Sequence, residues 1–211
     1  MAKKISDSAI HRLSLYVRIL EEWEREGRDT TSSEELAERG GTTAAQVRKD
    51  LSLFGSFGKR GLGYSVGELA DHIRSILGLG RTWRVALVGA GRIGTALLEY
   101  RGFRERGFDI VAVYDADPAK VGGCVGERTV RDVAGLEEGI RAEGVEIVVL
   151  AVPGEAVQPI VDLVVRAGVR GILNFAPLKP RVPEGVTVRD VNLVMELEAL
   201  SFALSQDGPD A

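Results

Sequence analysis

Three glycines near the middle of the 211-residue chain have the spacing Gly-x-Gly-x-x-Gly, at Gly89, Gly91 and Gly94. A strand-like apolar run precedes them at 84–88, and a helix-compatible segment follows. In this context the first glycine makes a tight turn, the second admits a pyrophosphate, and the third lets the helix pack on the strand. The pattern predicts a dinucleotide-binding loop, consisting of Gly89, Ala90, Gly91, Arg92, Ile93 and Gly94. The alternative is a glycine-rich turn without a ligand, because glycine is common here at 26 residues.

Asp115 ends the next strand-like run, about 20 residues beyond the last glycine of the motif. An acid at this place bonds the ribose 2′-hydroxyl and repels a 2′-phosphate, so Asp115 favours NAD(H) over NADP(H). Two further strand-like runs end in loops that contain a proline. Because ligands lie at the carboxyl ends of such strands, we expect these loops to border the nicotinamide half. Their predicted contacts are Val152 and Pro153 in one loop, and Asn174, Phe175 and Ala176 in the other. The alternative is that each loop is only a strand exit.

A locally basic segment lies at 43–64, where two arginines and two lysines face a single acid, Asp50. The whole chain has a formal net charge of −4, which argues against bulk, charge-driven binding to nucleic acid, so any contact must come from such a local patch. We expect Arg48 to bond a guanine bidentately and Lys49 and Ser52 to bond phosphates, with Lys59 and Arg60 entering a narrow minor groove. The full predicted DNA-contacting set is Thr43, Gln46, Arg48, Lys49, Ser52, Lys59, Arg60 and Gly61. A solvated charged face is the alternative.

The first third of the chain has the order of a winged helix. Apolar residues at helical spacing predict a helix over 9–26, and Ser32 with Glu35 forms a capping-box pattern that begins a short second helix. Thr43 with Gln46 repeats the pattern and begins a third helix over 43–54. A glycine-rich hairpin at 55–64 and a closing helix at 66–77 complete the domain.

The remainder alternates strands with helices. Strand-like runs at 84–88, 109–114, 146–152 and 170–174, with helical patterns at 132–142 and 155–166, favour an α/β fold with a Rossmann-like, doubly wound parallel sheet. A last helix at about 192–204 is too apolar for a free tail and is either docked on its own domain or exchanged with a partner. We expect a winged-helix domain at 1–78, a dinucleotide-binding domain at 83–190 and a dimerisation helix at 191–205.

Several classes of protein are not expected. No apolar run reaches the roughly 18 residues of a membrane span, and the start of the chain does not resemble a secretory signal, so we expect a cytoplasmic protein. One cysteine, Cys124, excludes an internal disulfide and a cysteine-cluster metal site. The two histidines, His11 and His72, lie outside the dinucleotide half, and no Tyr-x-x-x-Lys pair is present. We therefore expect neither catalytic nor metal-ligating residues.

These motifs together resemble the Rex-type redox-sensing transcriptional repressors, in order and over almost the whole chain. The similar segments are Gln46–Leu51, Phe54–Gly58, Arg60–Tyr64, Val88–Gly94 and Asn174–Pro177. The resemblance implies a homodimeric repressor that senses the NADH/NAD+ ratio and binds an inverted-repeat operator in double-stranded DNA when NADH is scarce. It implies that NADH closes the dimer and releases the DNA, and that the C-terminal helix is domain-swapped between the partner's two domains.

The resemblance also implies three switch positions. Arg18 and Tyr100 match family residues that exchange polar partners between the two states. The third family position is an acid followed by an aromatic residue, and here Asn192 and Leu193 stand there. Asparagine can hydrogen-bond but cannot form a charge-assisted pair with Arg18.

Two other functions are compatible with parts of the pattern. A small NAD-dependent oxidoreductase with an accessory N-terminal domain would need an acid–base residue that the dinucleotide half lacks. A CoA- or nucleotide-binding module without a DNA function would leave Asp115 unexplained.

Overall fold

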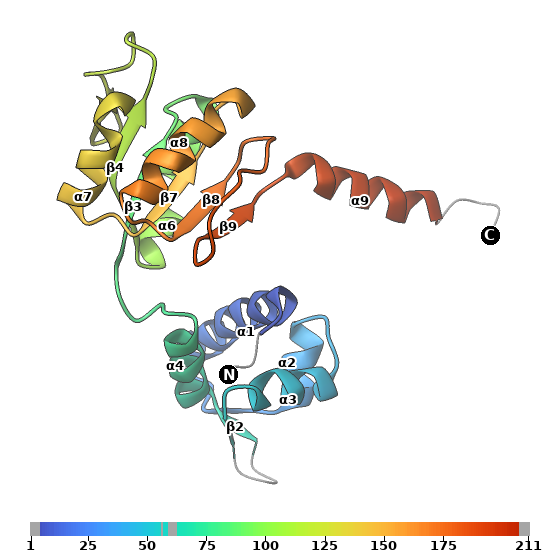
Figure 1. Cartoon of the computed structure of the whole chain (residues 1–211). Coiled ribbons are helices and arrows are strands. Elements are labelled where there is room, and N and C mark those ends of the chain that lie inside the picture. The colour runs from blue at the N-terminus through green and yellow to red at the C-terminus, as the bar shows by residue number, and fades with distance from the viewer. Residues whose placement is uncertain (1–4, 56, 59–62, 207–211) are drawn as a thin grey trace. The chain divides into compact units, whose positions relative to one another are not determined.

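The computed structural model describes residues 5–55, 57–58 and 63–206. The chain divides into two compact units, Met1–Arg81 and Thr82–Ala211. The first is mostly helical, and the second contains the larger sheet (Figure 1).

The N-terminal unit is a helix-turn-helix followed by a strand and a closing helix. Its elements are α1 (Asp7–Arg25), β1 (Thr30–Thr31), α2 (Ser33–Arg39), α3 (Ala44–Ser52), β2 (Tyr64–Ser65) and α4 (Val66–Ile76). Each helix begins at a hydroxyl side chain that accepts from a backbone amide, which supplies a partner that the first turn otherwise lacks. The predicted capping box of Ser32 and Glu35 is present, and Thr43 caps α3.

Two details of this unit differ from the sequence-based expectation. The third helix ends at Ser52 rather than at residue 54, with Leu53 as its C-cap. The strand pair that the structure describes joins β2 to β1 in antiparallel register, with Thr31 opposite Tyr64, a pairing that the sequence did not predict. Residues 56 and 59–62 of that hairpin lie outside the described residues.

One apolar core holds the N-terminal unit together. Its fully buried side chains include Leu13, Tyr16 and Leu20 from α1, Leu36 from α2, Val47 from α3 and Ile73 from α4. Phe54 and Phe57 pack against this core. Because α1 and α3 contribute to the same core, the position of α3 depends on α1.

The second unit is built on a seven-stranded sheet. Its elements are β3 (Trp83–Val88), α5 (Arg92–Glu99), α6 (Arg101–Glu105), β4 (Phe108–Asp115), β5 (Cys124–Val125), β6 (Arg128–Asp132), the 3-10 turn Val133–Gly135, α7 (Leu136–Glu143), β7 (Ile147–Leu150), α8 (Gly154–Arg166), β8 (Gly171–Asn174), β9 (Thr187–Asp190) and α9 (Leu193–Gln206). The strand order is β5-β6-β4-β3-β7-β8-β9, and every pair except β5–β6 is parallel. This confirms the predicted doubly wound sheet.

Alternate residues of β3 enter two different apolar clusters. Ala86 and Val88 join the cluster that contains residues of α7 and α8, whereas Val85 and Leu87 join the cluster that contains residues of α5 and α6. Since successive side chains of a strand point to opposite faces, these helices cover the two faces of the sheet. This arrangement explains why β3 is apolar at nearly every position.

Three strands of the sheet were not predicted, namely the two-residue strand β5, β6 and β9. The helix expected at 132–142 begins only at Leu136, because β6 occupies Arg128–Asp132 and the 3-10 turn follows it. β9 was not expected at all. In β6 only Val130 is buried, and in β9 no residue is buried, so neither segment has the continuous apolar run that marked the central strands.

α9 does not dock on its own domain. None of its residues is buried, and its large apolar side chains are between 59% and 73% exposed. The exposed side chains are Leu193, Val194, Met195, Leu197, Leu200, Phe202 and Leu204. Of the two alternatives left open for this helix, docking on its own domain is wrong for the described residues. Within those residues, no helix has the length and apolar content needed to cross a bilayer.

We predict that Ser32→Ala lowers the free energy of unfolding by about 1 kcal/mol, because the amide of Glu35 loses its capping acceptor. Thermal and urea denaturation followed by circular dichroism measure the change. The matched control is Ser75→Ala at an exposed position inside α4, where alanine is the better helix former and no loss is expected. Equal stability of Ser32→Ala and the wild type would contradict the role of the cap.

Candidate dinucleotide site and DNA interface

The candidate dinucleotide site lies where the strand order reverses, between the two neighbours of β3. Val88 pairs with Tyr114 on one side and with Leu150 on the other, and Leu150 pairs in turn with Asn174. The last residues of these strands therefore form one row, and the loops that follow them leave from the same edge. A reversal of strand order in an open parallel sheet is the usual place for a ligand.

The three glycines have three different surroundings. A Cβ on Gly94 would lie 1.8 Å from the carbonyl oxygen of Gly89, so α5 packs directly on the loop. Gly89 has a φ of 102°, and a Cβ there would lie 2.3 Å from the carbonyl oxygen of Ala151. No atom comes within 4 Å of a Cβ built on Gly91, which is the N-cap of α5. The space beside Gly91, at the start of α5, suits a phosphate group.

Asp115 closes the glycine loop from the neighbouring strand. Its Oδ2 accepts from the amide of Ala90 at 2.7 Å and from Lys120 Nζ at 3.0 Å, and its Oδ1 accepts from the amide of Asp117 at 2.9 Å. Burial alone would raise the pKa of Asp115, but the hydrogen bonds from Asp117, Lys120 and Ala90 outweigh it and lower the pKa. The carboxylate is therefore ionised at neutral pH and lies at the end of β4, beside the glycine loop. A contact between Asp115 and a ribose stays a prediction.

Lys120 was missed as a site residue by sequence reasoning. Its ammonium group lies within 4 Å of both Asp115 and Asp117, at 3.0 Å and 3.8 Å. The only signal in the sequence was a lysine five residues after Asp115. The contact between the two residues forms because the turn at 116–120 folds Lys120 back toward Asp115. Lys120 offsets part of the negative charge at this edge.

The other two predicted loops lie beside the glycine loop. A Cβ on Gly89 would also lie 3.0 Å from the side chain of Val152, and a Cβ on Gly154 would lie 3.6 Å from Leu178. The loops after β3, β7 and β8 therefore adjoin one another. Pro153 is exposed, Phe175 is half-buried, and Ala176 is 8% exposed.

Asn174 is fully buried and engaged within its own loop. Its Nδ2 donates to the carbonyl oxygen of Leu178 at 3.1 Å and to Asp190 Oδ1 at 2.8 Å, and its Oδ1 accepts from the amide of Ala176 at 3.1 Å. The side chain thus holds the 175–178 turn and fastens it to the end of β9. Direct contact between Asn174 and a cofactor stays a prediction, and the contacts in the structure are those of a residue that shapes the loop.

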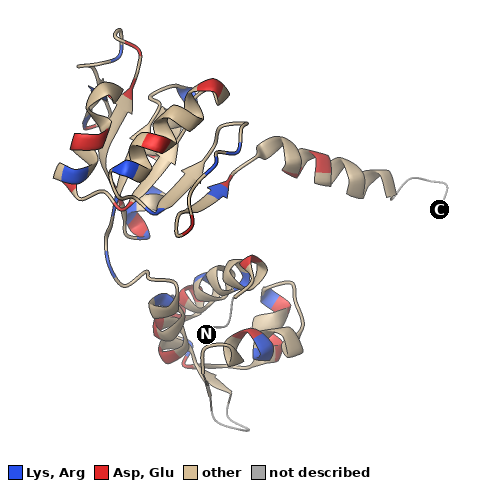
Figure 2. Cartoon of the chain, in the orientation of Figure 1, with Lys and Arg blue, Asp and Glu red and all other residues tan. Residues whose placement is uncertain are grey.

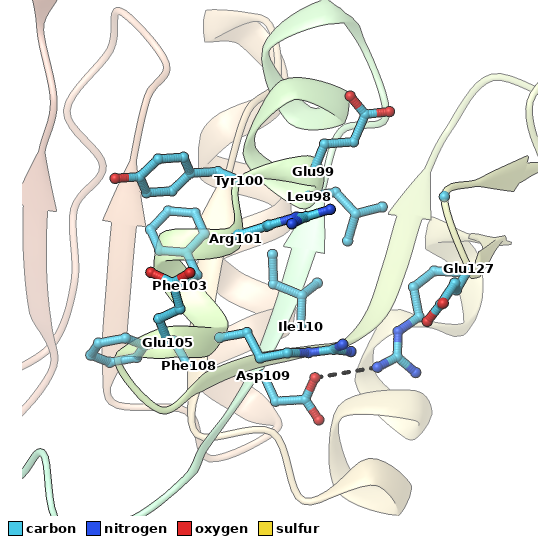
Figure 3. A pocket seen from close by; sticks show the side chains of 13 residues that line it. Leu98, Glu99, Tyr100, Arg101, Phe103, Glu105, Phe108, Asp109, Ile110 and Glu127 are labelled. Atoms are coloured by element: carbon cyan, nitrogen blue, oxygen red, sulfur yellow. Dashed lines mark hydrogen bonds and ion pairs between the residues drawn. The ribbon is translucent and has the colours of Figure 1, made fainter.

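A separate cavity of about 690 Å³ lies at the opposite edge of the sheet (Figure 3). It is lined by the end of α5, by α6, by the start of β4 and by the β5–β6 turn, and Arg128 bonds Asp109 at 3.3 Å within it. Because α5 runs from the glycine loop to this cavity, the two are at opposite ends of the helix. The cavity is not the dinucleotide site.

The three predicted switch residues belong to different elements. Arg18 is exposed on α1, and Tyr100 is 59% exposed after α5, where its ring meets that of Phe103 edge-on at 5.3 Å. Asn192 Oδ1 accepts from the amides of Val194 at 3.0 Å and Met195 at 3.3 Å, so this residue caps α9. A switch role for the three stays a prediction.

The predicted DNA-contacting side chains of α3 are accessible to different degrees. Lys49 and Ser52 are exposed, Thr43 is exposed at the N-cap, and Gln46 is half-buried. Basic positions on α3 stand beside acidic ones of the same unit (Figure 2). Lys59, Arg60 and Gly61 lie outside the described residues.

Arg48 is already engaged in the absence of DNA. Its Nη1 donates to Ser33 Oγ at 2.7 Å and to Glu34 Oε1 at 2.9 Å. The pair is solvent-exposed, with the two side chains 53% and 67% accessible, so its contribution to stability is small. A base contact by Arg48 therefore requires it to leave or share these partners.

Asp50, the single acid of the basic segment at 43–64, is buried rather than solvated. It is 1% exposed and accepts hydrogen bonds from Arg12 and Tyr16 of α1 and from Gln46 of α3. Arg12, Tyr16 and Asp50 were all missed as a group, because residues 34 to 38 positions apart give no joint signal in the sequence.

Two family models match the chain. One, described as a putative DNA-binding protein N-terminus, matches residues 4–52, and the other, described as a CoA binding domain, matches residues 80–178. Among the described residues, no group of three or more His, Cys, Asp or Glu side chains is placed to hold a metal ion.

Individual relatives match nearly the whole chain. The redox-sensing transcriptional repressor Rex of Carboxydothermus hydrogenoformans is 50% identical over 204 residues, covering 97% of this chain and 98% of that protein. The Rex of Chloroflexus aurantiacus is 45% identical over 201 residues, covering 95% of both. The chain belongs to the Rex family of redox-sensing transcriptional repressors. The homologues of this Rex-family chain are repressors rather than enzymes, despite the Rossmann-like domain.

Solved Rex-family structures share the fold. The structure of RSP in complex with NAD+ and operator DNA is 36% identical, with a TM-score of 0.92 over 97% of this chain and 94% of that one. The structure of RSP in complex with NADH is 35% identical, with a TM-score of 0.87 over 97% and 96%. The winged helix followed by a doubly wound sheet is therefore the Rex-family arrangement.

We predict that Gly91→Ala leaves the fold intact and weakens NADH binding by roughly tenfold or more, because the added methyl group occupies the space beside the start of α5. The backbone of Gly91 has a φ of −81°, which alanine adopts readily. NADH fluorescence titration measures the affinity and circular dichroism the fold. Gly80→Ala, where a Cβ also meets nothing within 4 Å, is the matched control. Unchanged NADH affinity of Gly91→Ala would place the pyrophosphate elsewhere.

Proposed function

We propose that this protein is a homodimeric repressor that binds an inverted-repeat operator when NADH is scarce and is released from it when NADH binds. The similarity that carries the proposal is to RSP, which has been solved with NADH and also with NAD+ and operator DNA. This chain has a loop for a dinucleotide and a helix-turn-helix in two separate units, so one ligand can influence the binding of the other only through a change in geometry. The action takes place in the cytoplasm.

In this proposal the dinucleotide lies along the edge where β3, β4, β7 and β8 end. The glycine loop with Arg92 and Ile93 takes the pyrophosphate, and Asp115 takes the adenosine ribose. The nicotinamide half borders the loops with Val152 and Pro153 and with Phe175 and Ala176, which Asn174 holds in place. Support comes from the adjoining loops, the open space at Gly91 and the ionised carboxylate of Asp115.

The operator contacts in this proposal come from α3 and the segment beyond it. Arg48 and Gln46 contact base edges, and Thr43, Lys49 and Ser52 contact phosphates. The proposed contacts of Lys59, Arg60 and Gly61 rest on the sequence alone, because these residues lie outside the described ones. Arg48 exchanges Glu34 for a guanine, whose O6 and N7 both accept from the guanidinium fork. The exchange costs little because the exposed pair with Glu34 contributes little to stability.

The proposed dimer uses α9. Seven large apolar side chains of this helix are more than half exposed, which a soluble chain rarely leaves uncovered. We propose that a second copy covers them by helix exchange. Asn192 caps α9 and so sets where the helix begins. In the proposed switch, Asn192 exchanges polar contacts with Arg18 and Tyr100.

Titrating NADH into protein bound to a fluorescent inverted-repeat duplex tests the redox function. We expect NADH to release the duplex, NAD+ to release little, and NADPH and CoA to have no effect. Asp115→Ala should need about 10- to 150-fold more NADH, since a hydrogen bond to a charged group contributes roughly 1.5–3 kcal/mol, while its operator affinity stays unchanged. Asp162→Ala, an exposed acid on α8, is the control. Release by CoA and not by NADH would overturn the proposal in favour of a CoA-binding function.

Sedimentation velocity tests the proposed dimer. Leu197→Glu combined with Leu200→Glu should convert the dimer to a monomer, because two charges are placed on a surface that the proposal buries. Glu198→Gln on the same helix is the control and should remain dimeric. If the double variant sediments as a dimer, α9 does not form the interface.

A further inference from the structure

The carboxylate of Asp50 is the most completely hydrogen-bonded group of the helix that faces DNA in the proposed function. Oδ2 accepts from Arg12 Nε at 2.6 Å and from the Tyr16 hydroxyl at 3.2 Å. Oδ1 accepts from Arg12 Nη2 at 2.8 Å and from Gln46 Nε2 at 2.7 Å. A carboxylate has about four acceptor positions, so all of those of Asp50 are in use.

Burying a charge between two helices costs desolvation free energy. Its neighbours Val47 and Leu51 pack α3 into the core with apolar side chains, and an ion pair replaced by well-packed apolar residues usually costs no stability. Burial would raise the pKa of Asp50, but the hydrogen bonds from Arg12 and Gln46 outweigh it and lower the pKa, so the group stays ionised. Packing alone does not explain why an acid occupies this position.

The fourth bond of Asp50 supplies an explanation. Gln46 lies one helical turn before Asp50 on α3, half-buried and beside the exposed Arg48 and Lys49. A carboxylate accepts from the amide nitrogen of Gln46 and repels its oxygen, so it selects one of the two orientations of the amide. One N–H then points at Asp50, and the other N–H stays next to the oxygen.

We infer that Asp50 is a positioning residue that holds the Gln46 amide so that its remaining N–H and its oxygen face an adenine in the operator. An adenine offers N7 as an acceptor and N6 as a donor in the major groove, and a glutamine amide matches this pair bidentately. The inference rests on the proposed function, in which α3 contacts base edges.

Arg12 and Tyr16 give the carboxylate a fixed place. Both belong to α1, where Tyr16 is fully buried and the side chain of Arg12 is 27% exposed. The amide of Gln46 is thus ordered before DNA arrives, and less side-chain freedom is lost on binding. The three bonds from Arg12 and Tyr16 attach Asp50 of α3 to α1, so the direction of the Gln46 amide follows α1.

A double-mutant cycle on operator binding tests the inference. The variants are Gln46→Ala, Asp50→Asn and the two combined, with affinity measured by fluorescence anisotropy on a duplex selected by the wild-type protein from a randomised library. In the wild type, Gln46→Ala should weaken operator binding about 5- to 100-fold. In the Asp50→Asn background the same change should cost less than about twofold, because the amide is no longer held.

Arg48→Ala is the matched control for the cycle. Arg48 is held by Ser33 and Glu34 rather than by Asp50, so its loss should be equal in both backgrounds. Asp50→Asn should also relax the preference for adenine at one position of the selected sites while changing the affinity for random DNA by less than about twofold. A role for Asp50 in folding alone would lower both affinities together.

A measurement on the unaltered protein covers the case in which Asp50→Asn fails to fold. The side-chain amide of Gln46 should show ¹⁵N order parameters close to those of the helix backbone, about 0.8 or higher. Values typical of a free surface amide would overturn the inference. An equal loss for Gln46→Ala in both backgrounds would overturn it too, leaving Gln46 as a contact that Asp50 does not position. No loss in either background would remove Gln46 from the interface, and NADH-dependent release would still test the proposed function separately.

Discussion

The cofactor half of this protein depends on one constraint, the reversal of strand order at β3. Because β4 and β7 both lie parallel to β3 and in register at their ends, the chain must leave three adjacent strands at one edge. The exit from β3 then passes so close to Ala151 that a side chain at Gly89 would meet its carbonyl oxygen. Asp115 completes the edge by accepting from the amide of Ala90, so the acid that we propose for the ribose also fixes the glycine loop that we propose for the phosphates. The site is therefore built largely by the backbone, before any cofactor is present.

Each unit contains a buried or nearly buried acid whose carboxylate fixes the orientation of a neighbouring amide. Asp115 is 8% exposed and Asp50 is 1% exposed, and hydrogen bonds lower the pKa of both despite their burial. Both carboxylates accept at several points and so hold a neighbouring group in one orientation, a backbone amide in one case and the amide of Gln46 in the other. Under the proposed function each unit is preorganised for its own ligand. Communication between them then has to change the relation of the units in the dimer rather than rebuild either site.

The sequence was informative where a local pattern decides the structure. Capping residues and apolar spacing placed the first four helices to within about two residues, and the glycine motif and Asp115 do lie together at the ends of β3 and β4. The strands β5, β6 and β9 were missed because they are short or sparsely buried and give no periodic pattern. They form by pairing with β6, β4 and β8 respectively. The pairing of Arg48 with Glu34 and the bonding of Asp50 to Arg12 and Tyr16 were missed because each depends on a tertiary contact between distant segments. Lys120 became visible only when the turn after β4 was known.

Under the proposed function, the dinucleotide and the operator bind to two alternative states of one dimer. Coupling between two ligands is reciprocal, so the factor by which NADH weakens operator binding must equal the factor by which the operator weakens NADH binding. The most direct test is the dissociation constant of NADH measured by calorimetry, with the protein free and with the protein saturated by operator duplex. We expect NADH to bind the DNA-bound protein more weakly than the free protein, by the same factor found in the operator titration. NAD+ should bind both with nearly equal affinity. Equal NADH affinity in the two states would contradict the proposed function.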